Sequence, residues 1–167
     1  MKTTIIVLVA IILLLVGYFA FNQKSPTYTN TENPETEQQV MSSDTVLDLS
    51  NQGLTQIPNS VFDKTSLEEL NVSNNQLTGA IQAEIRHLQN LRVLNASDNQ
   101  MTGVPAEIGQ LEKLEILNLA NNQLTGLPHE LGNLKNLKTL YIFGNNYSEA
   151  DLNIIKSNLD EDIVIIK

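Results

Sequence analysis

The chain is predicted to fold as an α/β solenoid with a parallel sheet, and three features of its sequence support this. A pattern of 23 to 24 residues recurs four times between Leu67 and Asn145. Each copy opens with Leu-x-x-Leu-x-apolar and reaches an asparagine three residues later. Within each copy apolar and polar residues alternate, as in a half-buried strand. A fixed repeat of this length predicts one short strand and one convex segment per turn, with neighbouring turns burying each other's apolar edges.

Residues 1–21 are predicted to form a transmembrane signal-anchor helix. Residues 3–21 carry no charge, and these 19 residues approach the roughly 20 needed to span a bilayer. A cleaved signal peptide is the other reading, but Tyr18-Phe19-Ala20 makes a poor cleavage site. An uncleaved anchor preceded by Lys2 predicts a single-pass protein of the cell membrane, whose C-terminal domain lies outside the cytoplasm. Cleavage after Ala20 would instead release a secreted protein.

Residues 22–43 are predicted to be a disordered linker. They are rich in Thr, Asn, Glu, Pro and Gln, and before Val40 only Tyr28 is a sizeable apolar group. Such a segment cannot bury enough surface to order itself. As a flexible coil it would hold the solenoid on the order of 25 Å from the membrane. Val40 and Met41 are expected to cover the open edge of the first repeat.

Residues 44–147 are predicted to form about five repeats, each contributing one strand. The complete copies begin at Leu67, Leu91, Leu114 and Leu137, and a degenerate copy starts at Asp44. Each strand is expected to point two apolar side chains into one continuous core, at Leu47 and Leu49, Leu70 and Val72, Leu94 and Ala96, Leu117 and Leu119, and Leu140 and Ile142. No single turn has a second apolar face, so stability must come from stacking.

A recurring asparagine follows each complete strand, where the chain bends. A buried amide at this point is expected to bond the backbone of its own turn and of the adjacent turn. Substitution by alanine should therefore cost about 1 to 3 kcal/mol. Gln52 occupies the position in the first copy, which indicates a terminal, imperfect repeat. The predicted structural ladder comprises Asn75, Asn99, Asn122 and Asn145.

Residues 148–167 are predicted to close the solenoid with a helix and a strand. Ser148-Glu-Ala-Asp151 reads as a helix capping box, and Leu152, Ile155 and Leu159 follow at helical spacing. The segment 163–166 then reads as a closing strand. Terminal caps of this kind keep solenoids from associating end to end, so a monomeric domain is expected.

The repeats resemble the leucine-rich repeat family, whose pattern LxxLxLxxNxLxxLPxxIxxLxxL is matched from about Thr45 to Phe143. The segments 77–85 and 124–131 are similar to the plant-type LTGxIPxEI and the shorter LPxEI variants. Gln82 stands where the family usually has proline. The resemblance implies a right-handed solenoid that binds proteins on its concave sheet and has no chemistry of its own.

Composition and motifs argue against an enzyme. The net charge of −9 disfavours nucleic acid as a partner. The chain has no cysteine nucleophile, no phosphate-binding glycine loop with its lysine and no HExxH motif, and His87 and His129 read as surface residues. The column Asn51, Asn74, Asp98 and Asn121 has too little charge for a calcium site and reads as solvated turns. No cofactor or metal is expected.

The outward strand positions form columns on the concave face. One column, Thr45, Glu68, Arg92, Glu115 and Lys138, alternates in charge and reads as structural electrostatics. The next column is mostly apolar and comprises Val46, Glu69, Val93, Ile116 and Thr139. Two more columns are polar or small and end in aromatic residues, which are enriched at binding hot spots: Asp48, Asn71, Asn95, Asn118 and Tyr141, and Ser50, Ser73, Ser97, Ala120 and Phe143. The alternative is that the aromatics only pack on the capping helix or the linker. The predicted partner-binding residues are Tyr141, Phe143, Ile116, Asn118, Asn95 and Val93.

The leading hypothesis is therefore a membrane-tethered, exported module that recognises a protein, a peptide or a cell-envelope component through its concave face. One alternative is a structural element of the envelope without a specific ligand. Another is a secreted accessory or inhibitor protein, which would follow from cleavage of the signal.

Overall fold

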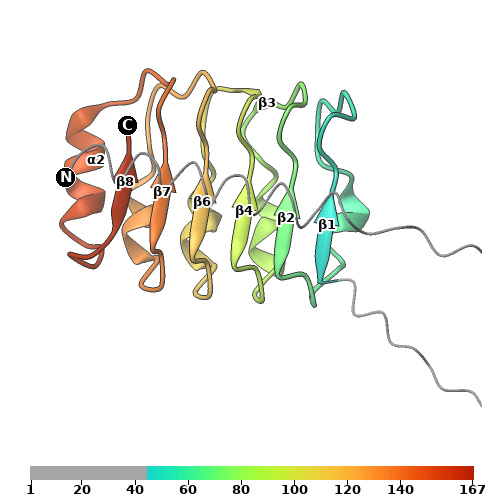
Figure 1. Ribbon diagram of the computed structural model, residues 1–167, viewed down its shortest axis with the longest axis horizontal. Coiled ribbons are helices and arrows are strands. Elements are labelled where there is room, and N and C mark those ends of the chain that lie inside the picture. Colours follow the sequence, from blue (N-terminus) through green and yellow to red (C-terminus); the bar gives the residue numbers. More distant parts are fainter. Residues whose placement is uncertain (1–44) are drawn as a thin grey trace, which may run out of the picture. The chain divides into compact units, whose positions relative to one another are not determined.

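The computed structural model describes residues 45–167, so the predicted anchor and linker, including the edge-covering role of Val40 and Met41, lie outside the described residues. Six parallel strands form one sheet in the order β1-β2-β4-β6-β7-β8 (Figure 1). Their bounds are Val46–Asp48, Glu69–Asn71, Val93–Asn95, Ile116–Asn118, Thr139–Tyr141 and Val164–Ile166. The predicted parallel sheet of stacked repeats is thereby confirmed. Between residues 45 and 167, no helix combines the length and the apolar character required to cross a membrane.

The repeats stack in register, so equivalent residues of successive turns lie side by side. Leu47 pairs with Leu70, Leu70 with Leu94, and this central ladder continues through Leu117 and Leu140. The central residue of each strand points inward, and its two neighbours point to the opposite face. From β2 to β7 the central leucines are at most 1% exposed, which confirms the predicted alternation.

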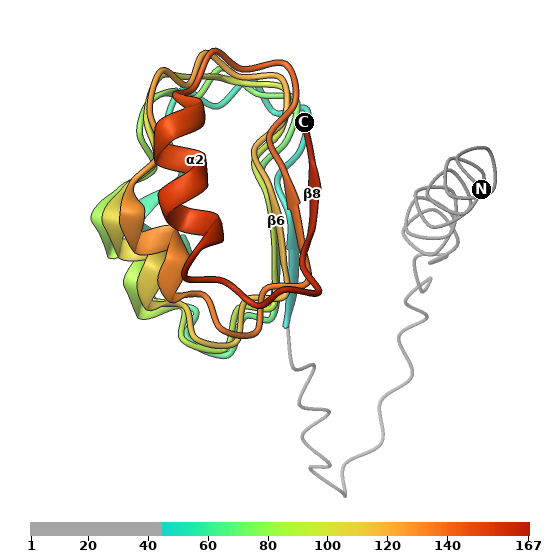
Figure 2. The ribbon, with the colours of Figure 1, turned by 90° about the vertical axis from the view of Figure 1, so that its left-hand side faces the viewer.

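Short 3-10 helices form the side of each turn opposite the sheet (Figure 2). Three of them follow a proline with extended backbone, Pro58, Pro105 or Pro128. Proline suits this N-cap position because its ring fixes φ near −65°, the value of the extended backbone there, and the helix needs no N–H from this residue. Gln82 adopts the same extended conformation, and its Nε2 donates to the Ile57 carbonyl of the preceding turn. The 3-10 helices span Asn59–Val61 (η1), Ala83–His87 (η2), Ala106–Gln110 (η3) and His129–Asn133 (η4).

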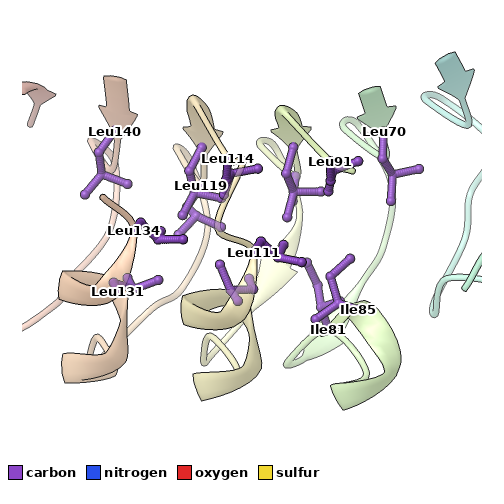
Figure 3. Packing of buried hydrophobic residues seen from close by; sticks show 14 of the residues in the cluster. Leu70, Ile81, Ile85, Leu91, Leu111, Leu114, Leu119, Leu131, Leu134 and Leu140 are labelled. Carbon is purple, nitrogen blue, oxygen red and sulfur yellow. The ribbon is translucent and has the colours of Figure 1, made fainter. Parts of the chain in front are cut away.

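One continuous apolar core lies between the sheet and the 3-10 helices (Figure 3). The helices contribute Ile85, Ile108 and Leu131, each 0% exposed. In the first turn Leu47, Leu49 and Leu54 are only partly buried, whereas their equivalents in later turns are covered on both sides. Burying a leucine stabilises the fold by roughly 1.5 to 3 kcal/mol, so each turn depends on its neighbours.

The turn after each strand requires a left-handed backbone. Asn51, Asn74, Asp98 and Asn121 have φ between 53° and 58°, and Gly144 takes the place in the last repeat with φ of 70°. Asparagine, aspartate and glycine tolerate this region better than other residues. The column of side chains therefore has a backbone reason that sequence reasoning did not identify. A short second sheet follows, in which β3 (Thr78–Gly79) pairs with β5 (Gln100–Met101), and it also was not predicted.

The side chains of the recurring asparagines form hydrogen bonds between successive turns. The Asn99 Oδ1 atom accepts the backbone N–H of Leu77 in the preceding turn at 3.0 Å. Its Nδ2 donates to the carbonyls of Val72, Ala96 and Ser97 at 3.0 to 3.2 Å. Asn75, Asn122 and Asn145 repeat the arrangement. Each amide thus joins two turns.

The C-terminal cap forms as predicted, with one addition. Helix α2 (Glu149–Lys156) begins after Ser148, whose Oγ accepts the N–H of Asp151 at 3.3 Å. Leu152, Ile155 and Leu159 are buried in the core. The closing strand does more than cover the end, because β8 pairs with β7 and becomes the sixth strand of the main sheet. In Figure 2, α2 stands on the side of the 3-10 helices and β8 on the side of the sheet.

Candidate functional site on the sheet face

The solvent-facing side of the six-stranded sheet, called the sheet face below, carries two rows of side chains. Strand register aligns the members of each row across neighbouring strands. The rows are two residues apart along each strand, or roughly 7 Å. The first row is Val46, Glu69, Val93, Ile116, Thr139 and Val164, and the second is Asp48, Asn71, Asn95, Asn118, Tyr141 and Ile166.

The polar residues of the second row hold the turn that follows each strand. The Asn95 Oδ1 atom accepts the N–H of Ser97 at 3.2 Å, and the Asn118 Oδ1 accepts the N–H of Ala120 at 3.1 Å. Asp48 and Asn71 do the same. Such side-chain-to-backbone bonds are typical of Asx turns. Asn95 and Asn118 are therefore structural residues first, although their Nδ2 groups donate to no residue between 45 and 167.

Tyr141 is the first residue of this row that is not asparagine or aspartate, and Ile166 is the other. Tyr141 stands where four preceding strands carry an Asx residue, and a phenol ring cannot make the Asx bond. Tyr141 is half-buried and lies between Asn118 of β6 and Ile166 of β8 in the register. The local demands of the turn therefore do not explain the choice of tyrosine.

The third predicted outward column is largely not exposed. Ser73 is 5% exposed, Ser97 6% and Ala120 1%, which contradicts their assignment to the solvent-facing surface. The reason is the Asx turn, which curls the chain over these small side chains; the Ser73 Oγ donates to the Asn71 Oδ1 at 2.8 Å. Phe143 occupies the same position in the last repeat and is 39% exposed. It is the only accessible large side chain of the column.

The charged column beside the first row forms a chain of ion pairs, as predicted. The Arg92 guanidinium lies 2.6 Å from Glu115 and 3.9 Å from Glu68, and Lys138 pairs with the other oxygen of Glu115. Hydrogen bonds from Lys138 and then from Arg92 lower the pKa of Glu115. The bond to Glu115 likewise raises the pKa of Arg92. The two cations and two anions balance, so the column adds no net charge.

The structure brings the predicted binding residues together on three neighbouring strands. Val93 pairs with Ile116, and Asn95, Asn118 and Tyr141 are consecutive in the second row. Phe143 follows two residues after Tyr141 and is accessible. Val164, which is 53% exposed, and Ile166 extend both rows beyond β7. Val164 and Ile166 were not predicted from the sequence. The apolar run of the closing strand would have indicated them if that strand had been assigned to the main sheet.

The described residues present no arrangement typical of catalysis. His87 and His129 belong to different 3-10 helices, and the Nε2 atom of the exposed His129 lies 3.7 Å from the half-buried Asp151 of α2. Residues 45–167 contain no cluster of His, Cys, Asp or Glu able to hold a metal ion. A depression of about 220 Å³, lined by Lys135, Lys138, Asp160 and Asp162 among others, lies where the strands begin and not on the sheet face.

Family models connect this architecture to known proteins. The model described as "Leucine Rich repeats (2 copies)" matches residues 89–129 and 112–159. The model described as "Leucine rich repeat" matches residues 45–101. No curated protein matches this chain.

Several solved structures share the fold. A leucine-rich repeat protein of Leptospira interrogans is 32% identical over 68% of this chain and 34% of that one, with a TM-score of 0.58. The ectodomain of the receptor kinase SOBIR1 from Arabidopsis thaliana is 29% identical over 72% of this chain and 66% of that one, with a TM-score of 0.58. The Arabidopsis receptor kinase ectodomain GASSHO1/SCHENGEN3, solved in complex with CASPARIAN STRIP INTEGRITY FACTOR 2, is 34% identical over 62% of this chain and 13% of that one, with a TM-score of 0.53. This chain therefore spans about a third of the bacterial protein and just under two thirds of the SOBIR1 chain.

Proposed function

Because the chain belongs to the leucine-rich repeat family, whose domains serve as protein-recognition modules, we propose that it is a membrane-tethered, exported module that binds a protein or cell-envelope partner on its sheet face. The similar receptor ectodomains support a recognition role. The cell-membrane location and the partner itself are parts of this proposal.

One observation supports the proposal most. At two positions the last complete repeat lacks the residue type that the earlier repeats carry, and at both it has an aromatic residue. Tyr141 replaces an Asx-turn residue, and Phe143 replaces a small, buried one. Aromatic side chains are favoured at recognition hot spots because they bury a large area at a low entropic cost. A purely structural envelope element would need neither departure.

The decisive experiment restores the consensus of the other repeats. Tyr141→Asn and Phe143→Ser install the residues found at these positions in earlier turns, so the double variant should fold at least as well as the native chain. The full-length chain in mild detergent is used to capture partners from the envelope of its source cells, and the affinity for a captured partner is then measured. Loss of two hot-spot aromatics should weaken binding by at least about 2 kcal/mol, or roughly 30-fold.

A control variant separates this effect from general apolar contact. Ile154→Ala removes an apolar side chain that is 42% exposed on α2, away from the sheet face, and should leave binding unchanged. Equal partner retention by the native chain and the double variant would remove this site. A large fall in the melting temperature of the double variant would instead show that the aromatics serve packing.

The tether is tested separately. Sequencing the N-terminus of the mature chain should show that residues 1–21 are retained. Separation of membranes from soluble fractions should find the protein with the membranes. A mature terminus just after Ala20, with the protein in the medium, would favour the secreted accessory or inhibitor. Size-exclusion chromatography with light scattering should report a single copy per detergent micelle, as expected for a monomeric domain.

A further inference from the structure

The two halves of the sheet face differ in chemistry. At the N-terminal end, Asp48 and Glu69 are exposed on adjacent strands, diagonally across the two rows. At the C-terminal end the same rows hold Tyr141, Val164 and Ile166, with Phe143 beside them. Valine, isoleucine, threonine and amide side chains lie between. Along the stacking direction, the two rows therefore carry carboxylates only at the N-terminal end, beside the exposed Val46, and an aromatic residue only at the C-terminal end.

The acidic end has unbalanced charge. Glu68 and Glu115 share Arg92, and Lys138 completes that column, so its four charges cancel. Neither Asp48 nor Glu69 forms a salt bridge within residues 45–167, and neither of the two rows contains a cation. The Asp48 Oδ1 accepts the N–H of Ser50, which leaves its other oxygen directed to solvent or a ligand. Two carboxylates on this face are thus available to a basic partner.

The dimensions of the face suit a single extended chain lying across the strands. The two rows are roughly 7 Å apart, so the side chains of one extended segment lying across the strands can reach both rows. Strands are about 4.8 Å apart, so three steps separate Glu69 on β2 from Tyr141 on β7, or about 14 Å. Four steps separate Asp48 from Tyr141, or about 19 Å. An extended peptide covers these spans in about four to six residues.

From this arrangement, and resting on the function proposed above, we infer that the ligand is an extended peptide segment that crosses the strands, with a Lys or Arg over Asp48 and Glu69 and an aromatic or aliphatic side chain on Tyr141 and Phe143. The basic and apolar residues are separated by about four to six residues, as the strand spacing dictates. Charge complementarity selects the basic end, and apolar burial anchors the other. The recognition surface then includes β1 and β2, which a ligand bound only at the apolar end would not contact.

A random library of displayed dodecapeptides, selected against the full-length chain in detergent micelles, tests this inference. Enriched peptides should pair a Lys or Arg with an aromatic or aliphatic residue at the stated separation. Asp48→Asn with Glu69→Gln should weaken such a peptide by roughly three- to tenfold, because each exposed ion pair contributes only modestly. Raising the salt concentration should shrink this difference, since exposed pairs are screened.

Glu84→Gln with Glu130→Gln provides a matched control. It removes the same charge from two exposed positions on η2 and η4, on the other side of the solenoid, and should leave peptide affinity unchanged. If both pairs weaken binding equally, the effect belongs to net charge, and the inferred contact is overturned.

The inference and the proposed function fail in different ways. The inference alone is overturned by peptides that carry no basic residue, whose binding requires Tyr141 and Phe143, and whose affinity is unchanged by Asp48→Asn with Glu69→Gln. A library that yields no binder, or only binders that tolerate Tyr141→Asn with Phe143→Ser, overturns peptide recognition at this face altogether.

Discussion

The asparagine ladder allows a quantitative prediction for Asn99→Ala. The side chain is 8% exposed and makes four hydrogen bonds to backbone groups. After truncation, each of the three carbonyls keeps another donor. The Val72 carbonyl still accepts from Asn75 Nδ2, the Ala96 carbonyl from Asn122 Nδ2, and the Ser97 carbonyl from the backbone N–H of Asn74. The N–H of Leu77 loses the only partner that the structure gives it. The damage is therefore one stranded buried donor and three weakened acceptors.

These losses set the magnitude. A buried donor without a partner costs about 1 to 3 kcal/mol, and weakening the bonded carbonyls adds about 1 kcal/mol more. Asn99→Ala should lower the free energy of unfolding by about 2 to 4 kcal/mol. Asn145→Ala should cost less, about 1 to 2 kcal/mol, because Asn145 is only partly buried and water can replace part of its bonding.

Urea unfolding of the full-length chain in detergent, followed by circular dichroism, measures both effects. Gln100→Ala is the matched control, since Gln100 neighbours Asn99, is exposed and uses its side chain in no hydrogen bond within residues 45–167. A loss for Asn99→Ala no larger than that for Gln100→Ala would refute the assignment of the ladder as the link between turns. Equal losses for Asn99→Ala and Asn145→Ala would refute the role of burial.

Three further predictions concern the stacking, the charged column and the cap. Gly109→Ala should cost about 1 to 3 kcal/mol, because a Cβ there would overlap a backbone carbonyl of η4, whereas Gly103→Ala, with its nearest atom 3.9 Å away, should be nearly neutral in thermal melts. The pKa of Glu115, followed by carbon-13 NMR, should lie below the ordinary value of a glutamate and should rise towards it in Lys138→Ala. In the native chain, the ion pairs of Glu115 stabilise the fold at every pH above the pKa of an unfolded glutamate. This stabilisation is lost as the pH falls through the lower pKa of the folded state. An unchanged pKa in that variant would contradict the assigned cause. Ser148→Ala should cost about 1 kcal/mol and fray α2 in amide exchange, since its Oγ caps the helix; unaltered exchange in α2 would argue against the cap.

The repeat pattern made most of the fold predictable. Leu70, Leu94, Leu117 and Leu140 recur at the repeat period with inward alternation, and they are the buried centres of their strands. Ser148 and the helical spacing after it predicted the cap equally well, because capping depends on residues a few positions apart. The short sheet of β3 and β5 was not predictable, since two residues such as Thr78-Gly79 carry no periodicity.

The candidate site was predictable only in part. Tyr141 and Phe143 stand out in the sequence because they interrupt columns of small polar residues. Val164 and Ile166 did not, because their exposure depends on β8 joining the main sheet beside β7. The roles of Asn95 and Asn118 in Asx turns also required atomic positions. The sequence alone could not separate side chains that hold a turn from those available to a ligand.

The family, the repeat boundaries, the strand alternation and the asparagine ladder could all be predicted from the amino-acid sequence. All of these follow from periodicity within single turns, and every turn repeats the same local demands. The accessibility of the outward side chains depends on the folded structure, in which Ser73 and Ser97 are covered while Phe143 is not. The same holds for the closing strand, which extends the sheet face. Both outcomes depend on how successive turns stack, a contact between distant residues that no local pattern encodes.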